Sequence, residues 1–276
     1  MGHLGAVLVG RQVKAASQRG DVSWVDLAVS TLLVGVAVVL SIWQKLALER
    51  SMLWATLRAA VQLVAVGSAL GLIVDPKRPV FLSWIWVGFM VVFAAFTVRQ
   101  RAREVPAAFR LALCATAAAA AVSLGVIFGL GLFPTEGRTI VPLAGMMVGN
   151  SMTATVVAAR RIVAELSDKR PEVEARLALG QPWPEAARPY VRSALRTALS
   201  NQIETTKALG IVALPGAMTG LILAGVKPLD AVKVQAAIMY LILGSVATTV
   251  TVVALGLTRQ LFTADHRLVR LARTAG

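Results

Sequence analysis

The chain has 276 residues and a formal net charge of +14, from 28 Lys and Arg residues against 14 Asp and Glu residues. Hydrophobic residues make up 57% and charged residues 15% of it, whereas soluble domains carry about 25% charged residues. Several windows of about 20 residues hold almost no charge, which is the length that a helix needs to cross a bilayer. These features exclude an ordinary soluble domain. They predict an all-α, polytopic helical membrane protein that forms one domain over residues 1–276.

The excess of basic residues is explained by the flanks of membrane spans, so we expect the lipid bilayer and no nucleic acid as a partner. Basic residues gather in residues 99–110, 160–203 and 258–276, and loops rich in Lys and Arg mark the cytoplasmic side. Residues 160–203 are therefore predicted to form a cytoplasmic loop and residues 258–276 a cytoplasmic tail. An N-terminal tail, residues 1–22, is placed outside. About seven transmembrane helices are predicted, over residues 24–43, 52–74, 80–98, 108–133, 140–160, 205–226 and 232–257.

The cytoplasmic loop has the pattern of two short helices with a break between them. Gly180 follows the run ARLAL, where glycine commonly ends a helix in the left-handed conformation. Pro182 suits the start of the next helix, and Glu185 falls in its first turn, where a negative charge is favourable. Three arginines then recur four residues apart on one face, which either meets lipid headgroups or a partner protein: Arg188, Arg192 and Arg196.

Polar residues inside the apolar segments are candidates for a transport path. Arg58 and Gln62 lie four residues apart on one face of span 52–74, where Arg58 either snorkels to the headgroups, forms a salt bridge or lines the path. Asn150 lies within span 140–160 and either bonds another helix or lines the path. Glu204 and Lys207 open span 205–226 three residues apart, so they either pair with each other or line the path.

Two segments rich in glycine and methionine are predicted in the outer half of the bilayer, facing each other across a gate or cavity. Glycine permits close helix packing, and proline leaves backbone carbonyls free. Methionine is also a flexible packing residue, and its thioether suits Cu(I) better than Fe(II) or Al(III), so no metal ligands are assigned. The predicted path residues in these segments are Gly145, Met146, Gly149, Pro215, Gly216, Met218 and Gly220.

The cytoplasmic loop resembles the coupling loop of permease subunits of ABC transporters. The elements that carry this resemblance are Leu179-Gly180, Gln181-Pro182, Glu185-Ala186-Ala187 and Leu214-Pro215. Over most of residues 43–270 the chain resembles the FetB-type permeases, which are described as iron exporters and have plant relatives that act in aluminium tolerance. The segments that carry this wider resemblance are LALER (46–50), RAAVQL (58–63), PLAGMMVGNSM (142–152), KALGIVALPGAMTGLILAG (207–225) and KPLDAVKVQ (227–235).

The resemblance implies the permease subunit of an ABC transporter in the bacterial cytoplasmic membrane, exporting iron or another metal. It also implies a permease homodimer and a separate ATP-binding subunit that holds ATP and Mg, with no cofactor bound by this chain and no enzymatic activity of its own. Trp183 is expected to be an exposed anchor for that subunit, because tryptophan is enriched among interface hot spots. The residues expected to contact it are Leu179, Gly180, Pro182, Trp183, Glu185, Ala186, Arg188 and Arg192.

A secondary transporter of a small solute or ion is the alternative function. It would need carboxylates for a coupling ion near the middle of the membrane, and no Asp or Glu lies in the middle of a predicted span. A membrane enzyme would need a nucleophile, a metal cluster or paired acids. The two histidines, His3 and His266, lie outside the spans, which argues against such an enzyme.

Overall fold

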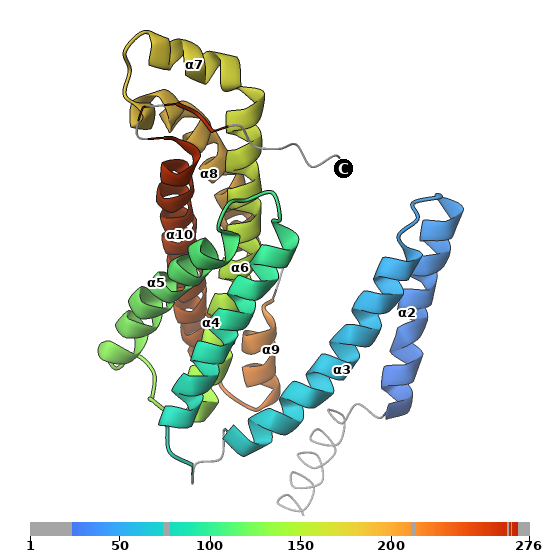
Figure 1. The fold of residues 1–276 in the computed structure, drawn as a ribbon. Helices are drawn as coiled ribbons and strands as arrows, with labels where there is room; N and C mark the ends of the chain where they lie inside the picture. Colours follow the sequence, from blue (N-terminus) through green and yellow to red (C-terminus); the bar gives the residue numbers. More distant parts are fainter. Residues whose placement is uncertain (1–23, 74–77, 211–213, 264, 266, 270–276) are drawn as a thin grey trace, which may run out of the picture. The chain divides into compact units, whose positions relative to one another are not determined.

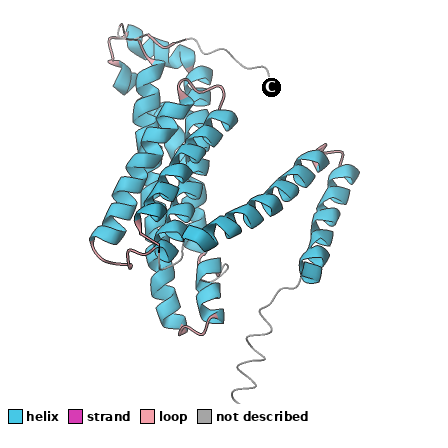
Figure 2. Ribbon diagram, turned by 60° about the horizontal axis from the view of Figure 1, so that its bottom comes forward, coloured by secondary structure: helices cyan, strands magenta, loops and turns pink. Residues whose placement is uncertain are grey.

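The computed structural model describes residues 24–73, 78–210, 214–263, 265 and 267–269. The predicted N-terminal tail, residues 1–22, lies outside them. Within the described residues every regular element is a helix, and the only pairing of extended backbone is a bridge between Phe262 and Leu268 (Figure 2). The chain divides into unit 1, Met1–Leu72, and unit 2, Ile73–Gly276, which are described separately.

Unit 1 is a pair of apolar helices, α2 (Trp24–Trp43) and α3 (Glu49–Ile73). Ser41 fastens the turn between them, because its hydroxyl donates to Glu49 Oε2 at 3.5 Å and accepts the backbone N–H of Leu48 at 3.3 Å. Leu33 and Leu63 are 75% and 73% exposed. Such apolar surfaces are stable in a bilayer but not in water, which fits a membrane protein.

Unit 2 is a bundle of four long helices with three further helices packed on it (Figure 1). The long helices are α4 (Phe81–Arg101), α5 (Ala108–Gly129), α6 (Gly137–Asp168) and α10 (Pro228–Leu261). Helices α5 and α6 both contact α4 and α10. Small residues allow this close packing: a Cβ at Gly256 of α10 would lie 2.6 Å from Leu111 Cδ1 of α5.

The prediction of a polytopic helical membrane protein is confirmed. Among the described residues, five helices are long and apolar enough to cross a membrane: Glu49–Gly71, Phe81–Arg101, Ala108–Gly129, Gly137–Asp168 and Pro228–Leu261. The described part of α2 adds a shorter apolar helix, Thr31–Trp43. Helices α6 and α10 have 32 and 34 residues, and about 20 suffice for a span. They therefore extend beyond the bilayer, and α6 carries α7 (Arg170–Ala178) at its end.

The predicted span over residues 205–226 does not form one continuous helix. Helix α8 (Trp183–Ala208) ends early in this stretch, and the next helix, α9 (Gly216–Leu223), has eight residues, which is too short to cross a bilayer. The break has local causes. Gly210 has a φ of +90°, and Pro215 is extended, with a ψ of 146°, and has no N–H for a helical bond.

Candidate functional site

The corner between α7 and α8, residues 179–182, has a defined backbone hydrogen-bond pattern within the predicted coupling loop. The N–H of Gly180 donates to the carbonyl of Leu177 at 3.0 Å, and the N–H of Gln181 donates to the carbonyl of Arg176 at 3.1 Å. With a φ of +81° at Gly180, these bonds form the Schellman motif that ends a helix at a glycine. The prediction of a left-handed C-cap at Gly180 is confirmed.

Helix α8 begins as the sequence predicts. Pro182 is its extended N-cap, with a ψ of 148°, and Glu185 lies in the first turn. Its length differs from the prediction of two short helices, because α8 runs for 26 residues to Ala208. One continuous helix therefore links the corner to the break at Gly210.

Trp183 is not the exposed anchor that the sequence predicted. It is half-buried, and its ring stacks on that of Phe262 with centroids 5.5 Å apart and an angle of 21° between the planes. Phe262 directly follows α10, so this contact joins segments far apart in the sequence and no local pattern signals it. Ala186 is also fully buried, so it positions α8 rather than forming its surface.

Leu179 is the large apolar side chain that the corner exposes. It is 83% exposed, beside Gly180 and Pro182, which are exposed as well. A single exposed apolar side chain is common on a protein surface, so this exposure makes Leu179 available to a partner without identifying one. Further along α8, exposed charged residues share the surface with it: Glu185, Arg188, Arg192 and Arg196.

A network of polar contacts fixes α7 to α8. Glu172 accepts a hydrogen bond from the Tyr190 hydroxyl at 3.0 Å and pairs with Lys169 Nζ at 2.9 Å. The hydrogen bond from Lys169, followed by that from Tyr190, lowers the pKa of Glu172 below its ordinary value. The pKa of Lys169 is raised by the same hydrogen bond. The sequence analysis missed this network. A signal was present, because Tyr190 lies in a series of residues four apart on α8 that indicates a packed face: Ala186, Tyr190, Ala194 and Ala198.

Arg170 ties α7 to the segment after α10. Its Nη2 donates to the carbonyl of Leu268 at 2.7 Å and its Nη1 to that of Val269 at 3.3 Å, while Nε pairs with Glu174 at 2.6 Å. Leu268 is itself buried in the apolar cluster beneath α8. Helix α7, which leads into the corner, is therefore fixed both by Tyr190 of α8 and by the segment after α10.

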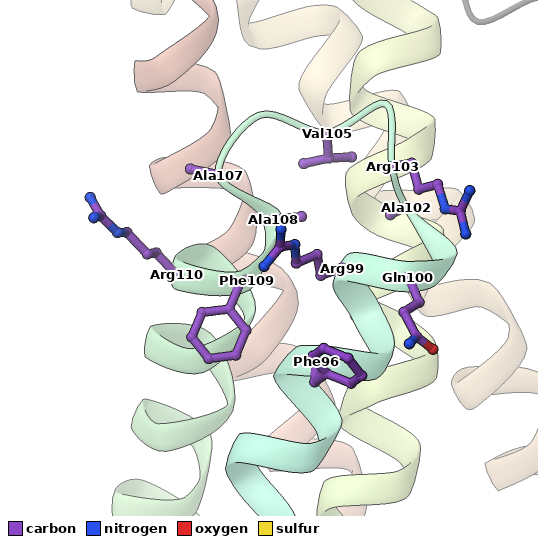
Figure 3. A pocket seen from close by; sticks show the side chains of 10 residues that line it. All are labelled: Phe96, Arg99, Gln100, Ala102, Arg103, Val105, Ala107, Ala108, Phe109 and Arg110. Atoms are coloured by element: carbon purple, nitrogen blue, oxygen red, sulfur yellow. The ribbon is translucent and has the colours of Figure 1, made fainter.

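A basic pocket lies between the end of α4 and the start of α5, with a volume of about 850 Å³. Figure 3 shows the Arg99 side chain between Phe96 and Phe109, while Arg103 and Arg110 point away on opposite sides. The neighbouring Glu104 pairs instead with Arg160 of α6 at 2.6 Å, which fastens this loop to the bundle.

The predicted path residues are distributed over both units, and the structure shows the local surroundings of each. Arg58 and Gln62 are exposed on α3 in unit 1. Asn150 bonds its own helix: its Nδ2 donates to the carbonyl of Met146, one turn back on α6, at 2.8 Å. Glu204 and Lys207 pair with each other at 2.9 Å on exposed α8 surface.

The two glycine and methionine segments border one apolar cluster of unit 2. Met146 of α6 and Ala217 of α9 both pack on it, while Met218 is half-buried. A Cβ at Gly145 would meet Met90 at 3.5 Å. The other predicted path glycines have no atom within 4 Å of a Cβ position: Gly149, Gly216 and Gly220.

The described residues contain no group of three or more His, Cys, Asp or Glu side chains that could hold a metal ion. The sequence assigned no metal ligands either.

The fold and the corner together define a class: a polytopic helical membrane protein whose longest helices carry a folded element beyond the bilayer. The chain belongs to the Uncharacterised protein family UPF0014, whose model matches residues 24–262. The family predicted from the sequence motifs is thereby confirmed, because the relatives include a protein named "Probable iron export permease protein FetB".

Three relatives illustrate the family. UPF0014 membrane protein STAR2 of Oryza sativa subsp. japonica is 40% identical over 78% of this chain and 75% of its own length. UPF0014 membrane protein YjkA of Bacillus subtilis is 32% identical over 89% of this chain and 98% of its own. The "Probable iron export permease protein FetB" of Escherichia coli is 32% identical over 88% of this chain and 94% of its own. No solved structure matches the chain.

Proposed function

We propose that this chain is the permease subunit of an ABC transporter in the bacterial cytoplasmic membrane, which exports iron or another metal. A separate ATP-binding subunit supplies ATP and Mg, and this chain performs no chemistry itself. The observation that carries the proposal is the corner at Gly180, which exposes Leu179 beyond the ends of the membrane-spanning helices. The name of the FetB relative supports both the permease role and the exported metal.

The contacts around the corner couple a movement of the partner to the long helices. Helix α7 is joined to α8 and to the segment after α10 by the contacts Tyr190–Glu172 and Arg170–Leu268. The buried apolar cluster below them includes Leu166 of α6 and Leu257 of α10. A partner that moves Leu179 therefore moves these helices as one body, which is how closure of two ATPases is converted into helix movement.

Helix α8 carries that movement to the proposed path. It runs unbroken from Trp183 to Ala208 and is followed by the break at Gly210 and Pro215 and by the glycine segment of α9. Substrate sites of secondary transporters are commonly formed by discontinuous helices, and we place the path of this permease at the same kind of break. The break also frees backbone carbonyls, which suit hard cations or their hydrated forms.

The proposal includes a permease homodimer. Gly149, Asn150 and Thr153 are exposed on one face of α6, within a helix long enough to span the membrane. Polar groups in a span favour a water-filled path or a second copy over lipid. This face is therefore our candidate for the surface that the two permeases share around the path.

The experiment is co-purification of the chain with its cognate ATP-binding subunit, followed by ATP hydrolysis in proteoliposomes across a panel of metal ions and small organic solutes. We expect a stable complex whose hydrolysis rises with one metal. An isolated permease that transports a solute down an ion gradient, with no effect of the ATPase, would instead establish the secondary transporter.

A further inference from the structure

A groove between α8 and α10 in unit 2 is lined in part by residues that the sequence assigned to the ATPase contact: Trp183, Glu185, Arg188 and Arg192. Its volume is about 470 Å³. Val191 and Leu195 of α8 form one apolar wall, and Ala254 and Leu255 of α10 form the other. Trp183 lines one end. The groove therefore has the shape and lining of a site for an apolar chain.

Cationic side chains lie along the α8 side of this groove. Arg188 and Arg192 line it, and Arg196 continues the same face one turn further. None of the three takes part in an ion pair among the described residues, whereas Arg160, Arg161 and Arg170 do: their partners are Glu104, Glu165 and Glu174. Glu185 also lines the groove, one turn before Arg188, but it is outnumbered by Arg188 and Arg192, so the groove carries net positive charge.

The groove lies at the level of the membrane surface. Helix α10 has no charged residue between Lys233 and Arg259, and the groove meets it over the last turns of that stretch, from Thr251 to Thr258. Gly256 of the same turns packs against Leu111, the residue after Arg110. Basic residues next to an uncharged span end mark the headgroup region, and the 69% exposed Leu255 faces outward there.

We infer that this groove binds an anionic phospholipid. Arg188 and Arg192 hold the phosphate through charge-assisted hydrogen bonds, for which the guanidinium fork is suited, and an acyl chain lies along Leu195 and Leu255. Basic pockets between membrane helices bind lipid headgroups by this combination. An acidic protein surface would match the arginines but would leave the apolar walls uncovered at membrane depth. The lipid satisfies both features, so it accounts for two arginines that the sequence assigned to the ATPase or to headgroups.

The test uses the purified full chain without the ATPase, so its outcome is separate from that of the coupling proposal. Native mass spectrometry in detergent compares dioleoyl phosphatidylglycerol with dioleoyl phosphatidylcholine. We expect the first to bind more tightly. Each basic residue near an anionic lipid is worth a factor of about five, so Arg188→Gln with Arg192→Gln weakens phosphatidylglycerol binding about thirty-fold. The matched control, Arg101→Gln with Arg259→Gln, removes two exposed arginines outside the groove and retains binding.

A second variant tests the groove without changing charge. Thr251 is exposed and lines the groove, so Thr251→Phe obstructs the place of the acyl chain and weakens binding of phosphatidylglycerol. Equal losses in both double arginine variants, equal binding of the two lipids, or full binding by Thr251→Phe would each overturn the inference. Retained phosphatidylglycerol binding by Arg188→Gln/Arg192→Gln would also overturn it and would leave these arginines to the protein partner. Lost dimerisation with retained lipid binding would assign the groove to a second copy.

Discussion

Gly180 fixes the direction in which the chain leaves α7, and its φ of +81° is one that other residues adopt only with strain. The neighbouring Leu179 is thereby left 83% exposed, while Trp183 turns inward onto Phe262. At this corner the local conformation decides which apolar side chain is available to a partner.

Gly180→Val should disturb the corner without preventing membrane insertion. A Cβ in the left-handed region costs about 1–2 kcal/mol, and a chain that relieves this strain misplaces Leu179. We expect reduced ATPase binding in pull-down experiments and unchanged amounts of protein in the membrane. Gly131→Val is the control, because Gly131 has a φ of +67° at the end of α5; it should keep ATPase binding. Equal loss in both variants would contradict the specific role of the corner.

Trp183→Ala should lower stability, not docking alone, because the side chain packs on Phe262. Aromatic pairs contribute about 0.5–1.5 kcal/mol beyond their burial. A double-mutant cycle of Trp183→Ala and Phe262→Ala, measured by thermal unfolding in detergent, should therefore yield a coupling energy of about 1 kcal/mol. Additive effects of the two substitutions would show that the stacked rings do not stabilise the corner.

Helix ends that depend on local residues could be predicted from the sequence. The corner follows from Gly180 and Pro182, and the start of α8 from Pro182 and Glu185. The end of α8 at Ala208 was missed, since hydropathy across residues 205–226 outweighed the helix-breaking effect of Gly210 and Pro215. The stack of Trp183 on Phe262 joins residues far apart in the sequence, and therefore only the folded chain reveals it.

The candidate path stays a prediction, and the structure adds the local bonds of its residues. Glu204 and Lys207 do pair, which their spacing on one helix allows. Asn150 bonds its own helix through Met146, an outcome that a sequence pattern does not distinguish from a bond between helices. The glycine segments were found by composition, but the space beside Gly149 and Gly220 depends on how α6 and α9 pack.

The attachment of α7 to α8 should weaken in acid. The pKa of Glu172 is lowered from 4.5 by its hydrogen bonds to Lys169 and Tyr190. The folded state therefore binds fewer protons, so this stabilisation is present above a pH of about 4.5 and is lost as the pH falls through the lowered pKa. Hydrogen exchange of α7 amides should accelerate over that range. Glu172→Gln should remove this dependence; an unchanged pH profile in that variant would rule out Glu172 as its source.

For the whole molecule, the polytopic helical class and the family are established, and the export path remains a proposal. The described residues hold five helices long and apolar enough to span a membrane, and the family model matches residues 24–262, which support the class and the family. The path depends on residues of α6, α8 and α9, with no cluster of metal ligands among the described residues. Transport of a metal through contacts with backbone carbonyls and water does not require such a cluster.

Gly149→Leu and Gly220→Leu should block transport while the chain still folds. Neither position has an atom within 4 Å of a Cβ, so added bulk does not clash inside the chain and instead fills the space beside it. Metal efflux from cells should fall, with membrane levels and ATPase binding retained. The contrast is Gly256→Leu, whose Cβ would meet Leu111 and which should reduce the amount of folded protein. If both path variants show normal efflux, these glycines serve only helix packing and do not line the path.

The most direct measurement of the central claim is the affinity of the chain for its ATP-binding subunit with Leu179 changed. Leu179→Asp places a charge on the exposed side chain of the corner without altering any buried contact. Loss of an interface hot spot costs about 2 kcal/mol or more, so binding should weaken about thirty-fold or more, and stimulated ATP hydrolysis should disappear. Leu179→Met should bind as the unchanged chain does. Unchanged affinity and hydrolysis for Leu179→Asp would contradict the assignment of this corner as the coupling element.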